Sequence, residues 1–361
     1  MKTTLVILLF WTLCAGSATI VRAVCIGASV NSFGAKGDGH TDDTAAIQSA
    51  INAAASAGGG SVVFNVARYY TTGTFIVPQG VVLCGTIEGP FDVAGVNPAL
   101  TTIAPTLLIT NTSSPFLTLQ GVGAGVTDLL FHYPNQVATS ASAPTVYPYT
   151  ITVTQGNAGT KVVRSTVTNA YNFLDIESGR SMAQDLFIGA FHTGVHIDHT
   201  YDRVTLRNLF NQVFWDVMGN RPYPQPIDTW VMSHATGLVV NRMDSLEIHD
   251  FFVFSRFTGI LLTDSTDTTQ GTTCGYGAGS DIDLDTVQYG IVVTATNTPG
   301  FKFTNVDIGS GNGGQAAVQV KTGGSTLPKI EINGGSQRGI WALGPYPTPP
   351  VGEEIIVNIL P

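Results

Sequence analysis

The chain has 361 residues, of which 11% are charged and 43% are apolar, with 16 basic against 25 acidic side chains. An average soluble domain has roughly 25% charged residues, so this composition argues against a disordered chain and a nucleic-acid-binding protein. The 41 glycines and 18 prolines indicate many turns. A chain of this length can bury a large core, in one domain or in two or three smaller ones.

The first residues have the pattern of a secretory signal peptide. Lys2 precedes a short apolar run and then small residues, with a cleavage position after Ala18 or after Ala23. The run is too short to span a bilayer, and no later segment is long and apolar enough to do so. We therefore expect a signal peptide at residues 1–23 and a secreted mature domain at residues 24–361, extracellular or periplasmic. Because Lys2 and Arg22 leave with the signal, 14 basic side chains face 25 acidic ones in the mature protein.

Three cysteines remain after this cleavage: Cys25, Cys84 and Cys274. An odd number excludes a fully paired framework, although one pair and one leftover thiol would suit an oxidising compartment. Three scattered cysteines in a large core are expected to be small buried hydrophobic residues. Their spacing does not match that of a zinc site, and we predict no metal site.

An amphipathic helix is predicted near the mature N-terminus. Thr41 or Asp42 is the expected N-cap, and the glycines at residues 58–60 end the helix before a strand begins. Its apolar face consists of Ile47, Ala50, Ile51 and Ala54.

The rest of the chain carries an internal repeat. A small residue followed by alternating apolar positions recurs at residues 194–198, 237–241, 259–263 and 290–294. With their counterparts, these segments repeat about every 22 residues, and a second series of short apolar segments runs in phase with them. Period-two alternation inside such a repeat is typical of a parallel β-solenoid. The helix would close the open N-terminal end of its core.

The run "FGAKGDGHTDDTAAIQSAINAAASAGGGSVVF", followed by "VLCGTIEG", closely resembles the opening of the pectate-lyase-like superfamily. This superfamily includes rhamnogalacturonases, polygalacturonases and many phage tailspikes. The resemblance implies an all-β fold, a single-stranded right-handed parallel β-helix with an N-terminal capping α-helix in the region of about residues 31–60. It does not define the reaction, because the superfamily contains lyases, hydrolases, epimerases and non-catalytic shafts.

Four polar residues on two successive repeats form the predicted catalytic group. Outward residues of stacked coils lie about 4.8 Å apart, and alternate residues of one strand about 6.7 Å apart. We expect Glu177 to stack on Asp198 as the acid/base or nucleophile pair, assisted by Asp175 and His196. Stacked carboxylates would suit a retaining hydrolase, and a diagonal pair such as Asp175 and Asp198 an inverting one. The alternative is a solvated polar face.

Aromatic and basic residues near this group are expected to bind sugar. Several belong to an insertion at residues 219–234, which would overhang a groove or pack as a turn on the flank of the solenoid. Aromatic rings stack on pyranoses, and arginines pair with uronate carboxylates. The predicted substrate-binding residues are Trp215, Arg203, Arg221, Tyr223 and Trp230.

These features predict a secreted enzyme that cleaves glycosidic bonds of an acidic, pectin-like polysaccharide by carboxylate-assisted hydrolysis. One alternative is a polysaccharide lyase acting by β-elimination, with Arg180, Arg203 or calcium neutralising the uronate. Another is a non-catalytic carbohydrate-binding or adhesion β-helix. We expect no cofactor, except calcium for a lyase. The expected partner is the polysaccharide, with no nucleic acid and no membrane, and the chain is expected to be a monomer or a homotrimer.

Overall fold

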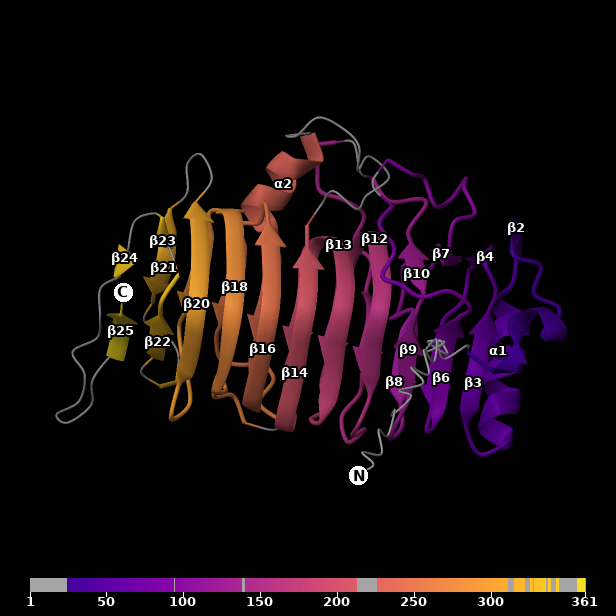
Figure 1. The fold of residues 1–361 in the computed structure, drawn as a ribbon, viewed down its shortest axis with the longest axis horizontal. Helices are drawn as coiled ribbons and strands as arrows, with labels where there is room; N and C mark the ends of the chain where they lie inside the picture. The colour runs from indigo at the N-terminus through magenta and orange to yellow at the C-terminus, as the bar shows by residue number, and fades with distance from the viewer. Residues whose placement is uncertain are drawn as a thin grey trace, which may run out of the picture.

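The chain winds as a parallel β-helix, passing once per coil through three ladders of parallel strands (Figure 1). We call them ladders A, B and C, in the order in which each coil meets them. The computed structural model describes residues 25–93, 95–137, 140–212, 226–269, 271–310, 315–321, 325–326, 328–335, 337–338, 342–343 and 356–360. The predicted signal peptide and the predicted binding residues Trp215, Arg221 and Tyr223 lie outside these ranges.

The short strands each belong to one ladder. Ladder A contains β1 (Gly27–Ser29), β3 (Gly60–Phe64), β6 (Val81–Gly85), β9 (Gly125–Thr127), β22 (Lys329–Asn333) and β25 (Ile356–Leu360). Ladder B contains β2 (Asp38–Asp42), β4 (Ala67–Thr71), β7 (Pro105–Ile109), β10 (Leu130–His132) and β23 (Gln337–Arg338). Ladder C contains β5 (Phe75–Pro78), β8 (Leu117–Gln120), β11 (Tyr149–Val153), β15 (Thr236–Val240), β17 (Thr258–Leu262), β19 (Tyr289–Val293), β21 (Ala316–Val320) and β24 (Ala342–Leu343).

Long strands in the middle coils pass through more than one ladder. Two of them contribute to all three, β12 (Lys161–Ile176) and β13 (Ser181–Ile197). Four contribute to ladders A and B, β14 (Thr200–Asn211), β16 (Met243–Phe254), β18 (Gly277–Val287) and β20 (Phe301–Ser310). A short 3-10 helix, η1 (Val30–Phe33), and two α-helices, α1 (Thr44–Ser56) and α2 (Pro226–His234), complete the fold.

The long strands bend from ladder A to ladder B at a single residue with left-handed backbone. Asp185, Asn208, Asp281 and Asn305 have φ values between 52° and 57°. Short Asn and Asp side chains tolerate this conformation better than other residues because they bond locally. The Asn208 amide donates to the Asp185 carboxylate over 2.7 Å, and the Asn305 amide donates to Asp281 over 2.6 Å. Adjacent coils are thereby joined at the bend.

The core is a stack of aliphatic side chains from equivalent positions of successive coils. In ladder C, Leu174, Val195, Leu238 and Ile260 pair in register and are 0% exposed. Alternate residues point outward, as period two requires. The predicted parallel β-helix is confirmed, because the repeat positions expected to be inside are the ones that form the core.

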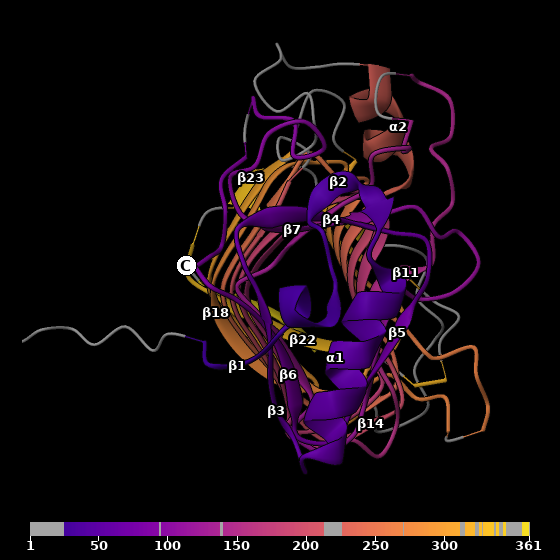
Figure 2. The same ribbon diagram turned by 90° about the vertical axis from the view of Figure 1, so that its right-hand side faces the viewer.

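Helix α1 lies at the N-terminal end of the coil stack and buries Ile47, Ala50, Ile51 and Ala54 (Figures 1 and 2). Its first residue is Thr44, and Asp43 occupies the N-cap position without a side-chain capping bond. The N-cap is therefore one or two residues later than predicted. Asp43 instead accepts the backbone N–H groups of Lys36 and Gly37 over 2.6 and 3.0 Å. Neither α1 nor any other helix of the described residues is long and apolar enough to span a bilayer.

Cys25 and Cys84 form a disulfide, so the expectation that all three cysteines are unpaired was wrong for these two. Their Cα atoms lie 6.2 Å apart although 59 residues separate them. Coil winding brings them together, which spacing along the chain does not reveal. Cys274 is free and fully buried, as predicted.

Removing this disulfide by the double change Cys25→Ala and Cys84→Ala is expected to lower the free energy of unfolding by about 2–4 kcal/mol, because the unfolded chain gains loop entropy. Urea unfolding of the mature chain measures the effect. Dithiothreitol should destabilise the parent to the same extent and leave the double variant unchanged. A reductant effect that persists in the double variant would contradict the assignment.

Candidate active site

The strand register places the four predicted catalytic residues at one edge of ladder C. Asp175 pairs with His196, and their neighbours Leu174 and Val195 point into the core. Glu177 follows the end of β12, and Asp198 follows the end of β13. The backbone N–H of Asp198 bonds to the Ile176 carbonyl over 3.0 Å, which continues the parallel register past these strand ends. The structure therefore brings all four side chains onto two adjacent coils, as the repeat alignment predicts.

The His196 ring is held between two acceptors. Its Nδ1 lies 2.8 Å from the Asp175 carboxylate, and its Nε2 lies 2.7 Å from Oδ1 of Asn241. The Asn241 amide nitrogen donates to the carbonyls of Thr263 and Asp264 over 3.1 and 2.8 Å, which fixes the orientation of this amide. Two acceptors facing the two ring nitrogens favour the imidazolium form of His196, in which both nitrogens donate.

Electrostatics agree with this geometry. Burial disfavours the charge on His196, but the hydrogen bond and charge of Asp175, together with the bond to Asn241, outweigh it and raise its pKa above the usual value. The Tyr149 ring stacks on the imidazolium with 5.9 Å between ring centroids and 17° between planes. An aromatic face next to a cation stabilises its charged form. Asp175 and His196 thus form an ion pair on the outer surface of ladder C.

Glu177 is a half-buried carboxyl in a pocket of about 450 Å³. Burial and the neighbouring Asp175 charge raise its pKa, and the charges of His199 and His196 only partly oppose this. The same pocket is lined by Arg180, His199 and Tyr201, at the turns that lead from ladder C to ladder A. A carboxyl of raised pKa next to an ion-paired carboxylate can supply a proton to a bound substrate.

Asp198 is 7% exposed and its carboxylate is fully engaged. One oxygen accepts the backbone N–H groups of His199 and Arg242 over 2.8 and 3.1 Å. The other oxygen accepts the Ser265 hydroxyl over 2.7 Å. These bonds join the turns of three coils. They favour an organising role for Asp198 next to Glu177, and its catalytic role stays a prediction.

Aromatic side chains gather at the opposite edge of ladder C. Trp230 of α2 is 8% exposed and stacks on His234 with 4.4 Å between ring centroids. Tyr171, which precedes the ladder C segment of β12, stacks on His192 at 4.8 Å and lies 6.0 Å from Trp230. Glu177 follows the same segment at its other end. The Asp175–His196 pair therefore lies between this aromatic cluster and the Glu177 pocket.

Two site features differ from the sequence prediction. Arg203 lies on ladder A, where it pairs with Glu247 over 2.8 Å, and the structure does not bring it to the Asp175–His196 pair. Asn241 was missed, although it follows β15 at the position equivalent to Asp198 and could have been found by extending the repeat alignment by one coil. Among the described residues, no group of three or more His, Cys, Asp or Glu side chains is arranged to hold a metal ion.

The coil architecture defines the protein as a parallel β-helix, and solved structures share it. Tailspike protein 2 from Escherichia coli O157:H7 bacteriophage CAB120 is similar with a TM-score of 0.55 and 11% identity, over 87% of this chain and 43% of that chain. The A-module of the Azotobacter vinelandii mannuronan C-5 epimerase AlgE6 is similar with a TM-score of 0.50 and 13% identity, over 86% of this chain and 87% of that chain. These likenesses support the fold alone.

Residues 27–213 match the family described as rhamnogalacturonase A/epimerase, pectate lyase-like, and the chain belongs to this family. It is also similar to alginate lyase 7 of Azotobacter vinelandii, with 58% identity over 45 residues, which are 12% of this chain and 5% of that protein. Mannuronan C5-epimerase AlgE2 of the same organism is 45% identical over 67 residues, 19% of this chain and 6% of that protein. The chain thus matches only about a twentieth of the length of these curated relatives.

Proposed function

We propose that the protein hydrolyses glycosidic bonds of an acidic polysaccharide, with Glu177 as proton donor and Asp175 as the second carboxylate. The observation that carries this proposal is the contrast between two carboxyl groups of one strand end. Glu177 is half-buried with a raised pKa, whereas Asp175 is paired with the His196 imidazolium. Glycosidases use one protonated and one ionised carboxyl group in this way.

Charge and family support the proposed substrate class. Arg180 lines the pocket of the proposed proton donor, and its exposed side chain, which pairs with Asp202 over 3.3 Å, lies where a substrate carboxylate can reach it. Such cations pair with uronate carboxylates. The family is named for a rhamnogalacturonase, and the relatives named above act on alginate or mannuronan, which are acidic polysaccharides. Trp230, predicted to bind sugar, is instead buried in a cluster with Phe191 and Ile227, and the partly exposed Tyr171 is the aromatic residue of this edge that a sugar can contact.

A lyase is the second candidate, because Arg180 and Tyr201 line the same pocket as Glu177. In β-elimination, a base removes a proton next to a uronate whose charge is neutralised by a cation or calcium. A protein that binds these polymers without cleaving them is the third candidate. We also propose secretion, which the Cys25–Cys84 disulfide supports, since disulfides persist in oxidising compartments.

The assay that tests the proposal follows reducing ends and ultraviolet absorbance together, on pectic, alginate and neutral polysaccharides, with and without calcium. With the acidic polysaccharides, we expect new reducing ends to form without an increase in ultraviolet absorbance. The anomeric configuration of the first product then distinguishes an inverting enzyme, whose two carboxyl groups lie roughly 6.5–9.5 Å apart, from a retaining one. NMR of the first product measures the anomer. Absorbance at every active substrate would establish the lyase, and no product on any substrate would refute both cleavage reactions.

A further inference from the structure

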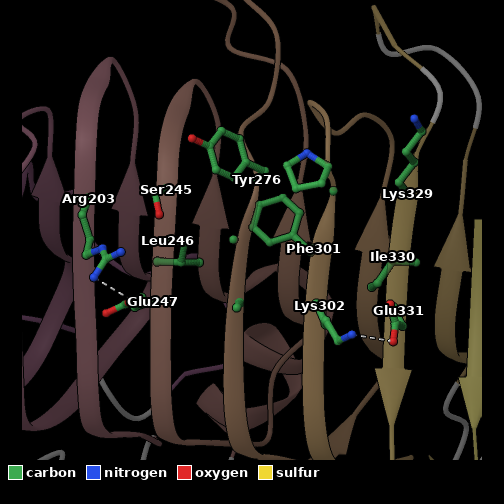
Figure 3. A pocket seen from close by; sticks show the side chains of 14 residues that line it. Arg203, Ser245, Leu246, Glu247, Tyr276, Phe301, Lys302, Lys329, Ile330 and Glu331 are labelled. Atoms are coloured by element: carbon green, nitrogen blue, oxygen red, sulfur yellow. Dashed lines mark ion pairs between the residues drawn. The ribbon is translucent and has the colours of Figure 1, made fainter.

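A second pocket, of about 540 Å³, lies on the outer face of ladder A toward the C-terminal end of the coil stack (Figure 3). It shares no lining residue with the Glu177 pocket. It forms because small residues stand at outward positions of neighbouring coils. Ser245 and Ala278 are two of these, and Gly300 is a third.

Two ion pairs border this hollow. Arg203 pairs with Glu247 over 2.8 Å on one side, and Lys302 pairs with Glu331 over 3.0 Å on the other. The register Glu247, Ala278, Lys302 places one alanine coil between the two pairs. Since coils stack about 4.8 Å apart, the strands of Glu247 and Lys302 are about 10 Å apart. Tyr276, Gly300 and Lys329 directly precede the paired residues Gly277, Phe301 and Ile330, so the same width separates Tyr276 from Lys329, with Gly300 between them. That gap admits a single pyranose ring over Gly300.

An aromatic ring and an unengaged cation lie at one end of the pocket. Tyr276 and Lys329 occupy the same end in Figure 3, while the Lys302–Glu331 pair lies at the other. Both Glu247 and Glu331 are committed to ion pairs, whereas the Lys329 ammonium makes none within the described part of the chain. The pocket therefore carries a net positive charge in a protein with a formal net charge of −9.

We propose that this pocket binds one carboxylate-bearing sugar residue of an acidic polysaccharide, separately from the site of cleavage. The Lys329 ammonium pairs with the uronate carboxylate, and the Tyr276 ring packs against the face of the pyranose. The Lys302–Glu331 pair, two residues further along the same strands as Gly300 and Lys329, meets the sugar hydroxyls. The inference rests on the proposed substrate class but not on the proposed reaction. A long polymer could then bind at this pocket and at the site of cleavage at once, and such bivalent binding is tighter than binding at either site alone.

The experiment is calorimetric titration of the mature chain carrying Glu177→Gln, so that no cleavage accompanies binding. The ligands are tetramers of galacturonate, mannuronate and guluronate, with the galacturonate tetramer methyl ester as a matched neutral ligand. We expect at least one acidic tetramer to bind at two sites. Adding Lys329→Met should weaken one of them about tenfold, the loss of one charge-assisted contact. It should also abolish the preference of that site for the acid over the ester.

Tyr276→Leu should weaken the acid and the ester alike at that same site, and Lys321→Met, which changes an exposed lysine of another ladder, should change neither. Equal thermal midpoints would show that the variants are folded. The inference is overturned if none of the acidic tetramers binds, or if Lys329→Met leaves every affinity unchanged. Binding that depends on Lys329 in a protein that cleaves nothing would support the pocket and refute hydrolysis. Cleavage without any Lys329 effect would refute the pocket alone.

Discussion

Replacing Glu177 by glutamine is expected to lower kcat by about 10²–10⁴-fold, the usual contribution of a general acid. Glutamine keeps the shape of the side chain, but its amide is not acidic enough to protonate the leaving group. The alkaline limb of the pH–rate profile should disappear as well, because the ionisation of Glu177 would set that limb. Initial rates of reducing-end formation across pH 4–9, on the substrate that the panel selects, measure both effects.

The same change should not destabilise the fold, and this separates catalysis from structure. Since burial and Asp175 raise the pKa of Glu177, its contribution to stability is present below the pKa of the unfolded chain and is lost as pH rises through the folded value. Above that folded pKa the parent carries the cost of an ionised half-buried group, which the neutral glutamine removes. The thermal midpoint should stay equal or rise.

The matched control is Asp283→Asn, another carboxyl of raised pKa, on the outer face of ladder B. It should retain full activity. A Glu177→Gln protein with the turnover of the parent would refute the role of Glu177 as proton donor.

Replacing Asp175 by asparagine is expected to remove turnover by a similar factor, about 10²–10⁴-fold, and to lower the pKa of His196. Asp175 supplies the charge and the hydrogen bond that hold this pKa above its usual value against burial. Asparagine removes the charge and the imidazolium loses its counter-ion. Titration of the His196 ring by NMR, with the seven histidines labelled, measures the pKa independently of activity.

Asn241→Asp is the counterpart with the opposite sign. In the parent, Nε2 of His196 lies 2.7 Å from Oδ1 of Asn241. The substitution replaces this amide oxygen by a carboxylate oxygen, which should raise the pKa of His196 further. The pKa of His196 should therefore fall in Asp175→Asn and rise in Asn241→Asp. If Asp175 had only a structural role, activity would fall without these opposite changes in the pKa of His196. The assignment fails if the two titrations coincide with that of the parent.

The free energy of unfolding should also depend on pH through the Asp175–His196 pair. The folded pKa of His196 lies above its value in the unfolded chain, near 6.5. The contact therefore stabilises the protein fully below about pH 6.5 and ceases to do so as pH rises through the folded pKa. Asp175→Asn should flatten this pH dependence of unfolding, which urea titrations at several pH values would show.

The repeat alignment predicted some contacts of the candidate site and missed others. Asp175 and His196 were placed side by side from the spacing of two repeats, because in a parallel ladder one residue of register decides which side chains face outward. Asn241 was missed because only two repeats were compared, although residues 237–241 belong to the same repeat series as residues 194–198. The engagement of Asp198 was out of reach of this alignment, because Ser265 and the backbone of Arg242 come from later turns.

Arg203 and the cysteines show a different limit. Arg203 follows the site closely in sequence, but the chain has by then turned the corner into ladder A, so its partner is Glu247 and its pocket is another one. Cys25 and Cys84 meet because two coils of winding return the chain to the same side of the solenoid. Proximity along the chain and proximity in space differ by whole coils in such a fold.

The sequence by itself determined the periodic part of this protein: the coil length, the inward rows such as Leu174, Val195 and Leu238, and the helical face of Ile47 and Ile51. These follow from local alternation, which repeats in every coil and requires no knowledge of distant contacts. Only the tertiary structure decided which polar groups meet. It gave His196 its two acceptors, engaged Asp198, joined Cys25 to Cys84 and created the pocket over Gly300. Each of these depends on how coils stack and how the turns between ladders fold across one another.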